Sequence, residues 1–316
     1  MVRSLPHHSI NDILNYACAS GCRLIAVRSN AVQELARSFS RIHRLSRLET
    51  LNFTFYPIND NSDRASRHAL QLSIFGALET SFRDQVPSKL TSLSLHNLRT
   101  FDFPPFDSPS FQNLLKTLRY FQLSDIYDIS RDDPMDPSRM THSYFWGTLC
   151  PHMLLAPMQN ALTELTLHSE AYIGIPSRLS LAGLHFPHLH ALSLRNLVFE
   201  PSIGVEPFIL RHATSLTKLE LLTCKLPNYT GVPWILSPPP SDPCWASIWD
   251  RFTTELTTQV SLHVDNSACS YVSIGFERFF YHLDNYRESR DATDFAALKH
   301  FHSVVTARSE EMRGES

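Results

Sequence analysis

The chain has 316 residues, of which 43% are hydrophobic and 19% are charged, and its formal net charge is −3 at pH 7. This composition is typical of a folded protein and excludes a generally disordered chain. The small negative charge gives no overall attraction to nucleic acid or to an anionic membrane surface, and no run approaches the ~18 apolar residues of a membrane span. We therefore expect neither nucleic acid nor membrane among the partners.

The start of the chain predicts an intracellular protein. It lacks a continuous apolar stretch after its basic residue, so it does not resemble a secretory signal. The six cysteines show no paired spacing, and such scatter fits reduced thiols. We expect the protein in the cytoplasm or the nucleus, and we treat residues 1–30 as a separate amino-terminal segment.

The first clear helix is predicted over roughly Ala31 to Arg47. Its apolar residues at helical spacing are Leu35, Phe39, Ile42 and Leu45. Its other face carries Arg37, Arg41, Arg44 and Arg47. An arginine stripe is typical of the solvated outer face of a first helix. The alternative is a site for phosphate or for an acidic partner.

Six copies of the pattern Leu-x-x-Leu-x-Leu then follow. They start at Leu48, Leu90, Leu118, Leu162, Leu189 and Leu216, at intervals of 42, 28, 44, 27 and 27 residues. The short intervals match the ~20–29-residue period of leucine-rich repeats, and the long ones suggest the same unit with an insertion. We therefore predict an α/β leucine-rich-repeat solenoid over residues 31–264. It would be curved, with a parallel inner sheet and with short helices or irregular returns outside.

The pattern also predicts which side chains face outward. Alternate residues of a strand point to opposite faces, so the leucines point inward and their neighbours line the concave surface. The residue between the second and third apolar positions is always polar, as a consistent register requires. From this column and the two beside it we predict a partner-binding surface formed by Asn52, Ser94, His96, Tyr120, Gln122, Glu164, Thr166, His168, Ser193, Arg195, Lys218 and Glu220.

Short helices should return the chain between strands. Ser108 and Pro109 predict a capped helix start. Its inward residues are Phe111, Leu114, Leu115 and Leu118. A second short helix is predicted over residues 207–213, and the polar stretches 57–67 and 128–143 are predicted as loops.

A proline-rich break at residues 237–243 ends the repeats. Asp242 can cap the next helix, with Pro243 at its first position. The buried stripe of that helix is predicted to be Ile248, Trp249, Phe252 and Leu256. Residues 260–264 alternate between apolar and polar side chains, which predicts one more strand. Residues 265–316 are predicted to form an aromatic-rich helical cap. The final helix should begin near Asp294 and pack through Phe295, Leu298, Phe301 and Val305.

The sequence offers few groupings for catalysis or for binding a metal. It has no GxSxG, HExxH, GxxxxGK[ST], GxGxxG or CxxC spacing, so we predict no enzyme, no cofactor and no metal. His185, His188 and His190 form the densest imidazole group, and three histidines can ligate zinc. Pro187 interrupts them, which favours exposed histidines of a loop. His96 and His168 share one outward column and could respond to pH near neutrality.

Several stretches resemble the fungal set of F-box and leucine-rich-repeat proteins, over roughly residues 30–310. They are PFILRHATSLTKLELLTCKLP, the tryptophan-containing helix after the proline-rich gap, and the closing DFAALKHFHSVVTAR. The consensus asparagine of the repeat is replaced by Leu98, Ile126, Leu197 and Cys224. One residue earlier stand Asn97, Asp125 and Asn196.

The resemblance implies a substrate-recognition subunit of an SCF-type ubiquitin ligase. In that family an F-box docks on a Skp1-like adaptor and the repeats recruit a protein substrate. The start of an F-box is faintly echoed by Leu5, Pro6, Ile10, Ile13, Leu14 and Tyr16. The remainder of an F-box is not recognisable, which favours a shortened member without the adaptor-binding module. The alternative is a leucine-rich-repeat adaptor unconnected to ubiquitination.

Overall fold

The computed structural model describes residues 34, 37–39, 41–45, 47–55, 64–83, 86–100, 104–126, 137–174, 179–201, 203–228, 244–265, 270–274, 281–282 and 288–314. The segment 1–30, with its echo of an F-box, lies outside the described residues. So do Leu35, Asp242 and Pro243. In the part of the chain that is described, no helix is both long and apolar enough to cross a membrane.

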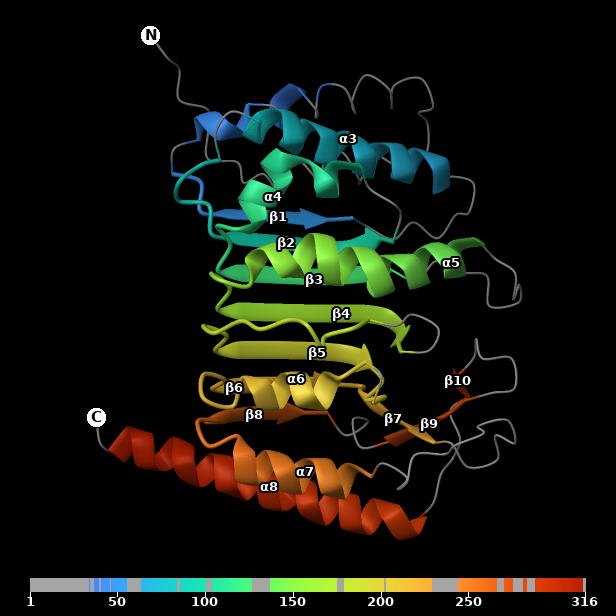
Figure 1. The fold of residues 1–316 in the computed structure, drawn as a ribbon, viewed down its shortest axis with the longest axis vertical. Helices are drawn as coiled ribbons and strands as arrows, with labels where there is room; N and C mark the ends of the chain where they lie inside the picture. Colours follow the sequence, from blue (N-terminus) through green and yellow to red (C-terminus); the bar gives the residue numbers. More distant parts are fainter. Residues whose placement is uncertain are drawn as a thin grey trace.

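A seven-stranded sheet forms the centre of the molecule, in the order β1-β2-β3-β4-β5-β6-β8 (Figure 1). Every neighbouring pair of strands is parallel. The strands are β1 (Thr50–Thr54), β2 (Ser92–Arg99), β3 (Tyr120–Ile126), β4 (Glu164–Ile173), β5 (Ala191–Leu197), β6 (Lys218–Leu222) and β8 (Ser261–Val264). The predicted α/β class with a parallel sheet is confirmed, and each leucine pattern supplies one strand.

The leucine patterns align from strand to strand. One continuous row across the sheet consists of Leu51, Leu93, Phe121, Leu165, Leu192, Leu219 and Leu262. The exposed fractions of Leu93, Leu165, Leu192 and Leu219 are 1%, 1%, 2% and 1%. Since burying a leucine side chain contributes about 2 kcal/mol, this row is a large part of what holds the sheet in register.

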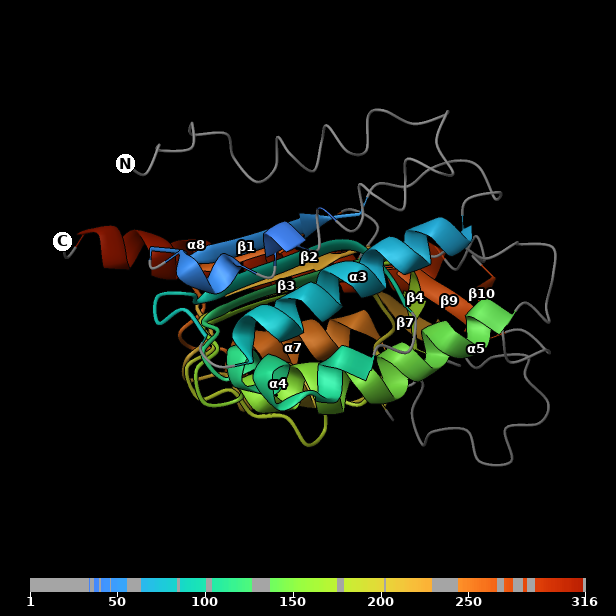
Figure 2. The same cartoon turned by 90° about the horizontal axis from the view of Figure 1, so that it is seen from above.

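Helices cover one face of the sheet. Figure 2 shows α3 (Arg64–Phe82), α4 (Pro109–Leu115), α5 (Pro137–Tyr144) and α7 (Trp245–Glu255) on the same side of the strands. The side chains between the leucines therefore lie on the opposite side. We call that side the polar face, and its residues are given in the next subsection.

The return helix α4 begins as predicted. The Ser108 hydroxyl accepts a hydrogen bond from the Phe111 N–H at 3.3 Å, and Pro109 occupies the first turn. The predicted inward residues are all buried: Phe111, Leu114, Leu115 and Leu118. Helix α6 (Val205–Arg211) begins two residues before the predicted range of 207–213, after Gly204 with a φ of +72°.

The first long interval contains a helix where a loop was predicted. Residues 64–67 belong to α3, so the predicted loop over 57–67 is wrong at this end. The helix forms because apolar residues recur at helical spacing further along the chain, and Ile74, Leu78 and Phe82 are buried. Gln71 fixes α3 to the sheet, because its side-chain amide donates to the Arg99 carbonyl and accepts from the Arg99 N–H.

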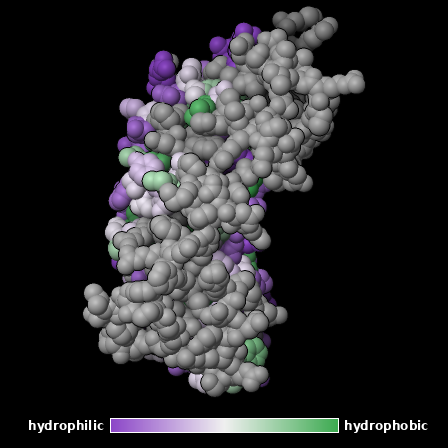
Figure 3. Space-filling view, turned by 90° about the vertical axis from the view of Figure 1, so that its right-hand side faces the viewer, coloured by the Kyte–Doolittle hydropathy of each residue, from purple (hydrophilic) through white to green (hydrophobic). Residues whose placement is uncertain are grey.

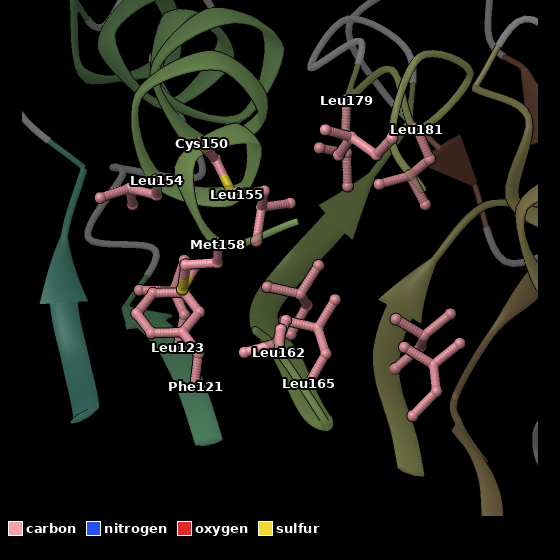
Figure 4. Close-up of a cluster of buried hydrophobic side chains, with 14 of the residues drawn as sticks. Phe121, Leu123, Cys150, Leu154, Leu155, Met158, Leu162, Leu165, Leu179 and Leu181 are labelled. Carbon is pink, nitrogen blue, oxygen red and sulfur yellow. The ribbon is translucent and has the colours of Figure 1, made fainter. Parts of the chain in front are cut away.

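The second long interval is also helical. Residues 137–143 of the predicted loop lie in α5, which continues into the π-helix η4 (Phe145–Leu155) and the 3₁₀-helix η5 (Ala156–Met158). Figure 4 shows Cys150, Leu154, Leu155 and Met158 near the sheet residues Phe121, Leu123 and Leu165. The sequence did not predict this helix because polar residues precede it at 128–136. Its continuous apolar stretch begins only at Phe145.

The predicted first helix is partly wrong. Its described residues are helical at 34 and 37–39 and then form the short 3₁₀-helix η1 (Ile42–Arg44). Phe39 and Ile42 are buried as predicted, but the exposed fraction of Leu45 is 48%. Leu45 has a ψ of 85°, so the chain leaves the helical path there and the residue no longer continues the inner stripe. The four predicted outer arginines are all exposed.

The carboxyl-terminal region packs α7 against α8 (Glu288–Gly314) and adds a small sheet. That sheet joins β7 (Lys225–Asn228), β9 (Ser270–Ile274) and β10 (Tyr281–His282). Helix α8 begins before Asp294. Leu298, Phe301 and Val305 are buried as predicted, whereas the exposed fraction of Phe295 is 65%. The buried face of α8 includes Asp294 in place of Phe295, because Asp294 binds the amino end of α7.

Candidate interaction surface

The polar face consists of three columns of side chains that run across the main sheet. The middle column contains Asn52, Ser94, Gln122, Thr166, Ser193, Glu220 and His263. The first column contains Thr50, Ser92, Tyr120, Glu164, Ala191, Lys218 and Ser261. The third column contains Thr54, His96, Ser124, His168, Arg195 and Leu222, with Asp265 after β8. None of these residues is buried.

The structure brings all twelve residues of the predicted surface onto this one face. Tyr120, Glu164, Arg195 and Lys218 are exposed, and the other eight are partly exposed. The sequence prediction missed His263, which extends the middle column onto β8. The alternation of residues 260–264 was the available signal, because it places His263 between two inward positions.

Four side chains of the polar face form a connected chain across β4, β5, β6 and β8. His168 Nε2 lies 2.8 Å from the Ser193 hydroxyl oxygen, and the Ser193 hydroxyl donates to Glu220 Oε2. Glu220 Oε1 lies 3.9 Å from His263 Nε2. Because Ser193 has a single proton and donates it to Glu220, His168 Nε2 must carry a proton and donate to Ser193.

The electrostatics of His168 agree with this assignment. Burial lowers the pKa of His168 below its usual value, and the positive charge of Arg195, with that of His96 when it is protonated, acts in the same direction. The Glu220 carboxylate opposes them, but the net shift is downward. Burial also lowers the pKa of His96. Both imidazoles are therefore neutral at pH 7, and His168 can act as a one-proton donor.

Left-handed backbone conformations occur in or just after three strands, near their carboxyl ends. Asn97, Asn196 and Thr223 have positive φ angles of 58°, 58° and 50°. The Asn196 side-chain amide donates to the Ser169 carbonyl at 2.7 Å, and the Thr223 N–H donates to the Asp265 carboxylate. Asparagine tolerates this left-handed conformation better than most residues do. Asn97 and Asn196 thus suit the left-handed backbone within β2 and β5.

Figure 3 shows the side of the molecule toward which the carboxyl ends of the strands point. Among the coloured residues of Figure 3, hydrophilic side chains predominate and hydrophobic ones form isolated patches. A small, separated apolar patch is ordinary for a protein surface.

The histidine group at residues 185–190 lies on the surface. The side chains of His185, His188 and His190 are exposed. Among the described residues, no three histidine, cysteine, aspartate or glutamate side chains are arranged so that they could hold a metal ion. The His185 ring stacks on that of His212 at 5.4 Å. His212 is buried, with Nδ1 2.7 Å from the Phe208 carbonyl and Nε2 accepting from the Phe186 N–H at 2.9 Å. These bonds give His212 a structural role that its position in the sequence did not reveal.

Comparisons with protein-family models, with curated proteins and with solved structures found no match for this chain.

Proposed function

We propose that this chain is a non-enzymatic protein-interaction scaffold, built as a leucine-rich-repeat solenoid, that binds a polypeptide on the polar face. The observation that carries the proposal is the division of the main sheet into two different faces. One face buries its leucines under helices, and the other presents three columns of mostly polar side chains. Repeat proteins commonly use such an extended sheet surface for recognition.

The geometry of Ser193 favours binding over nucleophilic catalysis. A catalytic serine gives its proton to a base that is oriented by a third group, and donors for an oxyanion lie nearby. Here the Ser193 proton is directed to Glu220, and His168 donates to the serine oxygen. Strand β5, which carries Ser193, pairs with β4 and β6, so its backbone N–H groups are used in the hydrogen bonds of the sheet. This arrangement suits a fixed, hydrogen-bonding surface.

The resemblance to F-box proteins extends the proposal to substrate recognition for an SCF-type ubiquitin ligase. The regular succession of one strand per leucine pattern supports the repeat part of that resemblance. An adaptor unconnected to ubiquitination is the alternative. Co-purification of the full chain with a Skp1-like adaptor after mild lysis separates the two, since its absence would contradict the ligase proposal.

The location of the binding site is tested with a triple variant of the middle column, Gln122→Arg, Thr166→Arg and Ser193→Arg. All three side chains are partly exposed on adjacent strands, so bulky charges there should abolish partner capture. The matched control is Asn113→Arg on the exposed side of α4, which should leave capture unchanged. If the triple variant folds and captures the same partners, the binding site lies elsewhere.

A further inference from the structure

Three histidines lie in two columns of the polar face, and a fourth, on α8, interacts electrostatically with one of them. They are His96 on β2, His168 on β4, His263 on β8 and His302 on α8, and we call them the imidazole row. His96 and His168 interact electrostatically, and so do His263 and His302. Glu220 connects the two pairs, since it is bonded to Ser193 and lies 3.9 Å from His263. The row therefore extends from the second strand to the last helix.

The fixed charges around the row nearly cancel. Arg195 on β5 and Glu220 on β6 act directly on His168. Glu164 on β4 and Lys218 on β6 are exposed in the first column of the same face. Asp265, which follows β8, binds the Thr223 N–H with both carboxylate oxygens. Strands β1 and β3 contribute uncharged side chains to the three columns. The charge of this face thus depends on the histidines.

Acidification changes that charge in one direction. Burial lowers the pKa values of His96, His168 and His302, and their histidine neighbours lower those of His168 and His302 further. These imidazoles are consequently neutral at pH 7 and gain a proton only as the pH falls below about 6.5, the usual histidine value. Each protonation adds one positive charge and a second N–H donor. The polar face then becomes cationic.

We propose that the imidazole row makes the polar face a docking surface for an acidic polypeptide segment, which it engages when the surroundings become mildly acidic. This inference rests on the proposed function and adds the chemistry of the partner and its control by pH. Aspartate and glutamate side chains remain ionised at about pH 5. They can then accept charge-assisted hydrogen bonds from imidazolium groups, while Arg195 and Lys218 add permanent positive charge.

The mixed charge of the face favours a polypeptide over a nucleic acid. Nucleic-acid binding normally relies on about six to ten phosphate contacts from lysine and arginine. In the three columns of the described sheet, the permanent cations are Arg195 and Lys218, and Glu164 and Glu220 lie among them. Two permanent cations fall short of the phosphate contacts that a nucleic acid needs, so we choose an acidic polypeptide as the partner.

The test uses the full chain and fluorescently labelled poly-L-aspartate, with binding followed by fluorescence anisotropy. Affinity should be about tenfold higher at about pH 5 than at about pH 7.5, in low salt, because the row gains charge. The variant His96→Gln, His168→Gln and His263→Gln should lose most of this difference. The matched control is His152→Gln with His188→Gln, two exposed histidines outside the row, which should retain it.

Each outcome separates this inference from the broader proposal. Equal poly-aspartate binding at both pH values, or an unchanged pH dependence in the triple histidine variant, would overturn the imidazole-row inference. Neither result would affect the proposed function, which is tested separately by partner capture at neutral pH. A labelled oligothymidylate that binds at about pH 5 as tightly as poly-aspartate would overturn the choice of a polypeptide. Circular dichroism at each pH verifies that every variant is folded.

Discussion

The Trp146 indole N–H donates a hydrogen bond of 3.0 Å to Asp125 Oδ2, and both side chains are fully enclosed by the protein. His142 Nε2 lies 2.9 Å from the same carboxylate oxygen. Asp125 is at the end of β3, and its two partners lie in α5 and η4. One carboxylate therefore fixes the helical insertion of the second long interval to the sheet.

Replacing Asp125 should destabilise the protein strongly. Asp125→Ala leaves the buried Trp146 N–H without an acceptor and removes the partner of His142, so we expect a loss of about 2–4 kcal/mol in the free energy of unfolding. Urea denaturation followed by tryptophan fluorescence measures this loss. Asp107→Ala, at an exposed aspartate before α4, is the control and should change stability by less than about 0.5 kcal/mol. Equal effects of the two substitutions would contradict the anchoring role.

His212 should make stability depend on pH. Burial lowers its pKa in the folded state, and its Nε2 must be unprotonated to accept the Phe186 N–H. Its contribution is therefore fully present above the unfolded value of about 6.5 and declines as the pH falls through the lowered folded pKa. We expect thermal unfolding temperatures to fall between about pH 7 and pH 5.

The substitution His212→Ala tests that assignment. At about pH 7.5 it should cost about 1–3 kcal/mol, because it leaves the Phe186 N–H buried and unpaired. Below the pH at which His212 becomes protonated, the difference from the unsubstituted protein should shrink. His188→Gln is the matched control at an exposed histidine nearby. A cost that is independent of pH would show that His212 contributes through packing alone.

Asp294 should stabilise the junction of α7 and α8. Its Oδ1 accepts the Ala246 N–H at 2.7 Å, and its Oδ2 accepts the Tyr271 hydroxyl at 2.6 Å. Asp294→Ala removes a capping acceptor from the amino end of α7, which should cost about 1–2 kcal/mol in chemical denaturation. Thr293→Ala, at the exposed preceding residue, should be nearly neutral. If both variants unfold at the same urea concentration, Asp294 does not cap α7.

Glu220 should control the protonation of His168. Burial is the main cause of the lowered His168 pKa, and the Glu220 carboxylate partly offsets it. Glu220→Gln removes the negative charge, so the pKa of His168 should fall further. A titration of the His168 ring protons by NMR measures the direction of the change. Glu164→Gln, at an exposed glutamate of the same strand as His168, should produce a smaller shift. A rise in the His168 pKa on Glu220→Gln would contradict the hydrogen-bonded chain.

The spacing of apolar residues by itself determined the central sheet of this protein. In each repeat the pattern alternates buried leucines with polar residues, and a slip of one residue would exchange the two faces. The register of Leu93, Leu165, Leu192 and Leu219 and the placement of all twelve predicted surface residues follow from that constraint. Local capping chemistry determined the start of α4 at Ser108 in the same way.

Only the tertiary structure decided the features that join distant residues. Helix α3 is fixed through Gln71 and the Arg99 backbone, the insertion through Asp125, and α7 through Asp294, each across more than twenty residues of chain. No local periodicity encodes such a pairing, because a single polar side chain becomes an anchor only when folding removes water from around it. For the same reason the sequence indicated only His96 and His168 of the imidazole row, and the positions of His263 and His302 became apparent only in the folded structure.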